Sequence, residues 1–96
     1  MSQLANPMHP GEVLKELYLN PMGIGAIALA RRLGVPRTRI ERLVKGTTGM
    51  TPDTALRLSR AFNTTPEYWM NMQTQHDMAV AAQTIDVSDI EPLYAA

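Results

Sequence analysis

The sequence contains no cysteine and no long apolar run. It therefore has no disulfide, no thiol nucleophile and no cysteine-bound metal, which suits a reducing cytoplasm. The longest apolar run, Ile24 to Ala30, is seven residues with a glycine inside, whereas a membrane-spanning helix needs about 20. The N-terminus lacks the charged start and apolar core of a signal peptide. We expect a cytoplasmic protein that does not enter a membrane.

Groups suited to catalysis are scarce. The only histidines are His9 and His76. His9 and Glu12 would make a metal pair, but no third ligand stands nearby, so a loop histidine is the simpler interpretation. The chain has no glycine-rich phosphate loop and no carboxylate pair beside a candidate base. We expect no enzyme activity, no metal and no cofactor.

Charge is balanced overall but unevenly distributed. The 96 residues, enough for one domain with a thin core, carry nine basic and nine acidic side chains, with a pI of about 6.7. Positions 31–45 hold six of the nine basic residues and one acid, Glu41, whereas positions 61–96 hold five acids and no Lys or Arg. Any affinity for nucleic acid must therefore come from a local basic face.

Helix start and stop signals divide the chain. A first helix is predicted from near Pro10, with Glu12 in its first turn, and the Asn20-Pro21-Met22-Gly23 turn should end it. Its expected buried face is Val13, Leu14, Leu17 and Tyr18.

Two later helices begin with the same signal, a threonine followed by proline and an acid. The helix from Pro52 should run to about Phe62 and the helix from Pro66 to about Ala82. The expected core residues of the former are Ala55, Leu56, Leu58, Ser59 and Phe62.

The helix from Pro66 carries apolar residues on several faces, so it needs more than one partner. One face holds Trp69, Met72, His76 and Val80. One partner is the core of the domain, and a second subunit would be another. We predict a surface for a dimer or protein partner comprising Trp69, Met70, Met72 and Asp77.

The central stretch, Ile24 to Gly46, has the pattern of two short helices joined by a tight turn. Ile27, Leu29, Ala30 and Leu33 should form the apolar face of the first helix, and Gly34 ends it with positive φ. Pro36 should open the second helix, whose inward residues are Ile40, Leu43 and Val44. This is the helix-turn-helix pattern, in which the second helix enters the major groove of DNA.

The charge pattern separates this interpretation from an ordinary helical hairpin. Positions 31–45, which include the outward face of the second helix, hold five arginines and Lys45. A solvated surface helix normally carries both positive and negative side chains. Arginine suits phosphates and guanine edges. A helical adaptor that offers this face to an acidic protein is the rival from another class.

Residue roles follow from this placement. The predicted base-reading residues lie in the second helix and are Arg37, Thr38, Arg39 and Arg42; Arg39 could instead hold a phosphate. The predicted phosphate contacts are Arg32, Lys45, Thr47 and Thr48, which would set register but not sequence. Glu41 lies about one turn from both Arg37 and Lys45 and could pair with either.

Three motifs together resemble the HigA-type antitoxins, within the phage-repressor-like helix-turn-helix proteins. They are His9 to Glu12 followed by Leu14 to Glu16, the central pattern from Leu29 to Gly46, and Thr65 to Gln73 with Asp77. The third is the most specific, since many repressors share the second. The family often has a polar residue at the start of the first helix of the unit that reaches a phosphate. The resemblance therefore implies a phosphate contact at Gly25, which offers only its backbone N–H.

The resemblance implies an all-α, five-helix domain that dimerises, binds a palindromic operator and represses its own operon. It also implies a partner, a HigB-type toxin that cuts mRNA on the ribosome. A stand-alone regulator without a toxin is the alternative. We predict a flexible lead over residues 1–8, a DNA-binding and dimerisation domain over 9–82 and an irregular tail over 83–96. The tail either frays or docks on a partner or a second subunit.

Overall fold

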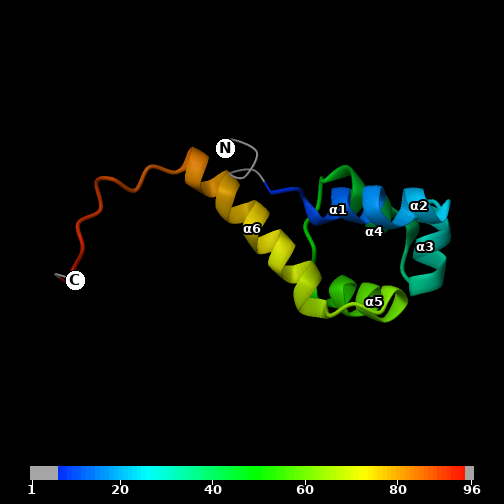
Figure 1. Cartoon of the computed structure of the whole chain (residues 1–96). Coiled ribbons are helices and arrows are strands. Elements are labelled where there is room, and N and C mark those ends of the chain that lie inside the picture. The colour runs from blue at the N-terminus through cyan, green and yellow to red at the C-terminus, as the bar shows by residue number, and fades with distance from the viewer. Residues whose placement is uncertain (1–6, 95–96) are drawn as a thin grey trace.

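The computed structural model describes residues 7–94, and within them every regular element is helical. The first helix is continuous through α1 (Pro10–Val13), the π-helical η2 (Leu14–Leu19) and α2 (Asn20–Met22). The others are α3 (Ala26–Leu33), α4 (Arg37–Lys45), α5 (Pro52–Phe62) and α6 (Pro66–Thr84). The five-helix, all-α prediction is confirmed (Figure 1). Of the predicted flexible lead, residues 1–6 lie outside the described residues, and Pro7 and Met8 are irregular.

The first helix begins at Pro10 as predicted but departs from the α-helical period. In η2 the N–H of Asn20 donates to the carbonyl of Lys15, five residues back, which is the π-helical pattern. The buried pair is therefore Leu14 and Leu19, five residues apart, and the predicted core residue Leu17 is 61% exposed.

The prediction that the Asn20-Pro21-Met22-Gly23 segment ends this helix is confirmed, although Pro21 itself does not break it. The helix returns to α-geometry at Asn20 and continues through Pro21 and Met22. Gly23 ends the helix with φ 67°.

Two other apolar residues, Ile27 of α3 and Leu56 of α5, were predicted to be buried but lie on the exposed faces of their helices. Ile27 is 46% exposed and Leu56 is 59% exposed, while Leu29 and Leu58, each two residues further on, are buried. Successive residues of an α-helix are rotated by about 100°, so residues two apart lie on nearly opposite faces.

The start signals of the last two helices are confirmed by their hydrogen bonds. The Thr51 hydroxyl accepts from the Thr54 N–H, and the Thr65 hydroxyl accepts from the Tyr68 N–H. Asn63, with φ 57°, ends α5 in the left-handed region. The helix predicted to stop near Ala82 continues to Thr84.

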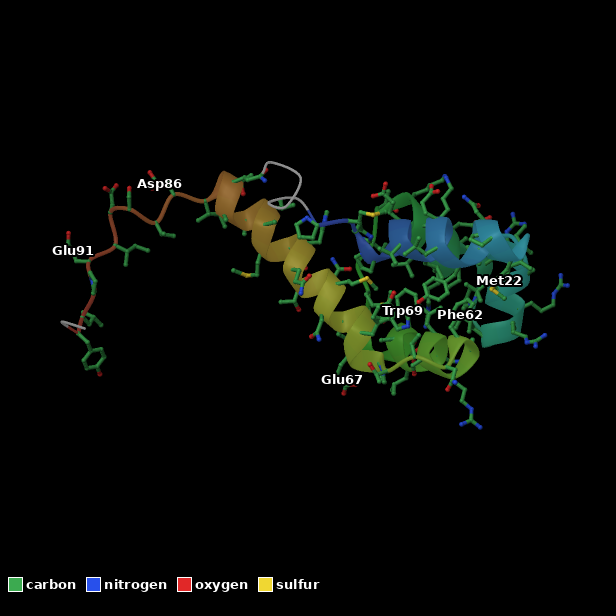
Figure 2. All side chains as sticks on the ribbon, viewed as in Figure 1. Met22, Phe62, Glu67, Trp69, Asp86 and Glu91 are labelled. Atoms are coloured by element: carbon green, nitrogen blue, oxygen red, sulfur yellow. The ribbon has the colours of Figure 1, made fainter. Side chains whose placement is uncertain are left out.

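Trp69 is the centre of the core. It is fully buried, its ring packs 5.3 Å from that of Tyr18 and 6.4 Å from that of Phe62, and its indole N–H donates to the Thr64 hydroxyl at 2.8 Å. Figure 2 shows Trp69 and Phe62 pointing into the bundle. The expectation that Trp69 contributes to a partner surface is therefore wrong, because its own chain covers it; Met70 and Met72 are half-buried against the same core.

The molecule is elongated, with extents of 52 × 25 × 22 Å. Figure 1 shows why: α6 runs out of the bundle and the tail continues away from it. Over residues 85–94 the tail is irregular and exposed, with no strand. Figure 2 shows Asp86 just beyond the end of α6 and Glu91 further out along the tail, away from the bundle.

Candidate nucleic-acid interface

The turn between α3 and α4 aims one face of α4 outward. Gly34 adopts φ 72° and its N–H donates to the last carbonyls of α3, a conformation that favours glycine. Pro36, with φ −62° and ψ 143°, caps α4 rather than forming its first turn as predicted. Ile40 and Leu43 are buried, so the opposite face of α4 is left to solvent.

That outward face carries the predicted base-reading side chains, Arg37, Thr38, Arg39 and Arg42, all of them exposed. The pairing of Glu41 is resolved: its carboxylate lies 4.0 Å from Arg37 Nε, one turn away. Because the Arg37 side chain is 64% exposed, this ion pair is weak and Arg37 keeps access to a ligand.

A groove of about 460 Å³ runs beside α4 and gathers several predicted residues. Thr38, Arg39, Arg42 and Thr48 line it together with Asp53 from α5. Predicted base readers and one predicted phosphate contact therefore share one hollow.

The loop after α4 is fixed by local bonds. Gly46 ends the helix with φ 79°, and the Thr47 hydroxyl donates to the Arg42 carbonyl at 3.1 Å. Lys45, Thr47 and Thr48 are exposed around this turn, on the same end of α4.

The remaining two predicted phosphate residues lie on α3. Gly25 is the exposed N-cap of that helix. Arg32 lines a hollow between α3 and α5 with Arg57 and Arg60, and not the groove beside α4.

Gly11 brings the first helix directly against α4, and no sequence signal other than the family motif marks this role. A Cβ at Gly11 would overlap the backbone carbonyl of Leu43. This close approach is possible only for glycine and sets the position of α4.

His9 precedes the first helix and caps its N-terminus. Its Nδ1 accepts from the Gly11 N–H at 2.9 Å, so it is the N-cap of the first helix. The His76 ring lies 5.1 Å from it. Burial, and secondarily the neighbouring His76, lower the pKa of His9 below its ordinary value, which favours the neutral acceptor.

Gln73 of α6 fixes the end of the α4–α5 loop that lies next to α5. Its side-chain oxygen accepts from the buried Met50 N–H at 2.6 Å, and its amide donates to Asp77 at 2.9 Å. The sequence predicted Asp77 as a partner-surface residue; it is exposed and also orients Gln73.

No group of three metal-binding side chains lies together in residues 7–94. Among these residues, no helix is both long and apolar enough to span a membrane.

The basic outward face of α4 and the glycine turn before it agree with comparisons to known proteins. A family model described as helix-turn-helix matches residues 14–69. The chain belongs to the helix-turn-helix family. Virulence-associated protein I of Dichelobacter nodosus is 50% identical over 76 residues, covering 79% of this chain and 70% of that protein. Antitoxin HigA-1 of Vibrio cholerae is 40% identical over 72 residues, covering 75% and 68%.

A solved structure extends the similarity to nearly the whole chain. Antitoxin GraA in complex with its operator superposes with a TM-score of 0.87 at 40% identity, over 94% of each chain. Solved structures named as HigA antitoxins also superpose on this chain, so the similarity to HigA-type antitoxins holds in sequence and in fold.

Proposed function

We propose that the protein is a sequence-specific DNA-binding antitoxin that represses its own operon. The observation that carries this is the outward face of α4, where Arg37, Thr38, Arg39 and Arg42 are exposed on a helix whose other side is buried. The similarity to GraA, solved with its operator, supports it.

In this proposal the N-terminal half of α4 lies in the major groove. Arg37 and Arg42 donate to guanine edges, and Thr38 offers a hydroxyl and a methyl group. Lys45, Thr47 and Thr48 neutralise or bond phosphates at the end of α4, and Gly25 donates its backbone N–H to a phosphate at the start of α3.

A homodimer presents two copies of α4 to a palindromic operator, with half-sites about 34–36 Å apart or a multiple of that. The proposed interface is the part of α6 beyond the bundle and the tail that follows it. Met78 is 62% exposed, Val80 45% and Ile85 61%, so apolar surface remains there for a second copy. Sedimentation at micromolar concentration should show a dimer that Met78→Lys weakens; a wild-type monomer with and without DNA contradicts this proposal.

A basic, HigB-type toxin is the second proposed partner. It would dock on the acidic part of the chain between Glu67 and Glu91, away from α4, since opposite charges steer association. Deleting residues 84–96 and reversing Asp77 to Lys should weaken co-purification with the toxin. An intact complex after both changes would place the docking site elsewhere.

A stand-alone repressor shares the DNA-binding part of this proposal but has no toxin. A binding assay on the promoter of the protein's own gene tests the shared part and separates it from the adaptor alternative. We expect a mobility shift of that fragment that is lost with a scrambled fragment and with rising salt. Equal affinity for both fragments would reject sequence-specific repression.

A further inference from the structure

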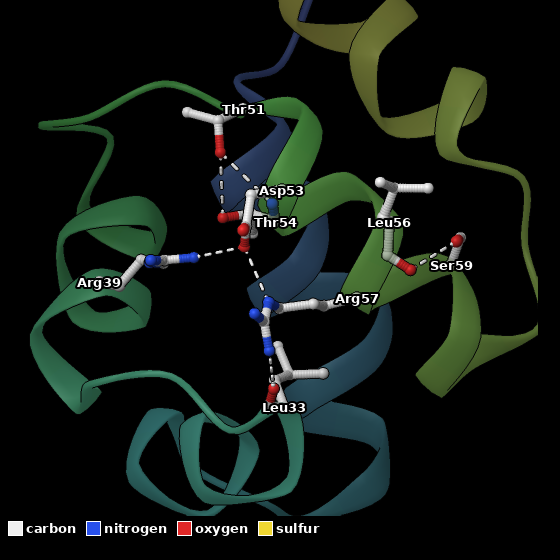
Figure 3. Close-up of polar contacts among 8 residues, drawn as sticks. All are labelled: Leu33, Arg39, Thr51, Asp53, Thr54, Leu56, Arg57 and Ser59. Atoms are coloured by element: carbon white, nitrogen blue, oxygen red, sulfur yellow. Dashed lines mark hydrogen bonds and ion pairs between the residues drawn. The ribbon is translucent and has the colours of Figure 1, made fainter.

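Asp53, at the start of α5, connects α4 to the end of α3. Its Oδ1 accepts from Arg39 Nη1 and from Arg57 Nε, each at 2.7 Å. Arg57 Nη1 in turn donates to the Leu33 carbonyl at 2.8 Å. Figure 3 shows this chain of contacts, with Arg39 reaching from α4 to the carboxylate between the two arginines.

The contact restrains Arg39 without using up its donors. Only Nη1 meets Asp53, so the edge formed by Nε and Nη2 still carries two parallel N–H groups, the fork that recognises a guanine. The side chain remains 41% exposed and lines the groove beside α4. An unrestrained arginine would have to lose much rotamer freedom on meeting a base.

The contact also limits the positive charge of the surface. Bonds from Arg57 and, secondarily, Arg39 hold the pKa of Asp53 below its ordinary value, so the carboxylate is ionised at neutral pH. One negative charge thus sits between two positive ones. Removing it would leave both arginines available to any phosphate, a contact that carries no sequence information.

We propose that Asp53 is a positioning residue that determines specificity: by holding Arg39, it makes this arginine discriminate among bases instead of binding phosphates generally. Asp53 itself touches no DNA in this proposal. The inference rests on the proposed DNA-binding function.

The test compares dissociation constants for a promoter fragment of the protein's own gene and for a scrambled fragment, by fluorescence anisotropy. Asp53→Ala should lower the ratio of the two affinities about 2- to 12-fold, which corresponds to the ordering of one rotamer-rich side chain. Affinity for the scrambled DNA should stay equal or increase. Asp53→Asn, which keeps the size and loses the charge, should move the ratio in the same direction and serves if the alanine variant unfolds.

Glu67→Ala is the matched control. Glu67 holds the same place after threonine and proline at the start of α6, so its removal costs a similar helix-dipole interaction. Among residues 7–94 no ion pair involves Glu67, and its variant should keep the wild-type ratio.

The double variant decides whether Asp53 acts through Arg39. With Arg39→Ala already present, removing Asp53 should leave the affinity ratio unchanged. A further loss in that background, or an equal loss of affinity for both DNAs in Asp53→Ala alone, would overturn the inference and leave the DNA-binding function standing. A wild-type protein that does not prefer its promoter would instead reject the function itself.

Discussion

Replacing Gly11 by alanine should separate the first helix from α4. The added Cβ would overlap the carbonyl oxygen of Leu43 and would lie 2.6 Å from its carbonyl carbon. Both are backbone atoms of α4, so no side chain can rotate away to relieve the contact. The helix pair must move apart, and α4 is the helix that carries the proposed base readers.

The magnitude follows from two opposed effects. Alanine in place of a helical glycine stabilises by about 0.5–1 kcal/mol through backbone entropy. Overpacking that forces a backbone shift costs about 1–3 kcal/mol and occasionally more, and an overlap with backbone belongs at the upper end. We expect Gly11→Ala to lower the free energy of unfolding by about 2 kcal/mol or more, and to weaken DNA binding even when the protein is fully folded.

Urea unfolding followed by Trp69 fluorescence measures the first effect, and anisotropy with promoter DNA measures the second. Gly25→Ala is the matched control, since no atom lies within 4 Å of a Cβ there and φ is −101°; its stability should change by less than about 1 kcal/mol. A Gly11→Ala protein as stable as wild type, with unchanged DNA affinity, would refute the close packing of the first helix on α4.

Two further predictions concern Gln73 and His9, whose hydrogen bonds hold the α4–α5 loop and the start of the first helix. Gln73→Leu leaves the buried Met50 N–H without its acceptor and should lower the free energy of unfolding by about 1–3 kcal/mol in urea titrations; Asp77→Asn, which keeps an acceptor for Gln73, should cost less. Because the pKa of His9 is lowered in the folded protein, His9 of the unfolded chain is protonated at a higher pH than His9 of the folded chain. The free energy of unfolding should therefore be full above about pH 6.5 and decline as the pH falls further. In His9→Asn, which keeps a cap acceptor, this decline between pH 7 and 5 should be smaller; an identical decline would contradict the assigned cap.

Much of the fold could be predicted because its signals are local. Gly34 and Gly46 end their helices in the left-handed conformation, and Thr51 and Thr65 cap the following helices, each as the sequence indicated. The exposed face of α4 followed from the spacing of Ile40 and Leu43. These features depend on steric preferences within a few residues.

The errors share a different cause. The π-helical η2 moves Leu19 into the core in place of Leu17. A prediction that assumes 3.6 residues per turn cannot anticipate this change of face. Trp69 was assigned to a partner surface because helical spacing gives a face but not its neighbour, which turns out to be Tyr18 and Phe62.

The exposure of the arginines on α4 could be predicted from the sequence, but the contacts that hold them could not. The outward arginines of α4 were found from charge density in the sequence. The contact of Arg39 with Asp53 spans 14 positions and that of Met50 with Gln73 spans 23, so no local pattern predicts them. Asp53 was expected only as an acid in the first turn of a helix.

We propose that α4 reads bases at its N-terminal half and holds phosphates at its end. The most direct measurement compares Arg37→Ala and Lys45→Ala on matched and scrambled operator DNA over a range of salt concentrations. Arg37→Ala should cost about 1–3 kcal/mol on the matched DNA and relax the preference at one base position in each half-site. Lys45→Ala should weaken binding to both DNAs alike and reduce the salt slope by about one unit. An equal loss of affinity for both DNAs in Arg37→Ala would contradict base reading by Arg37.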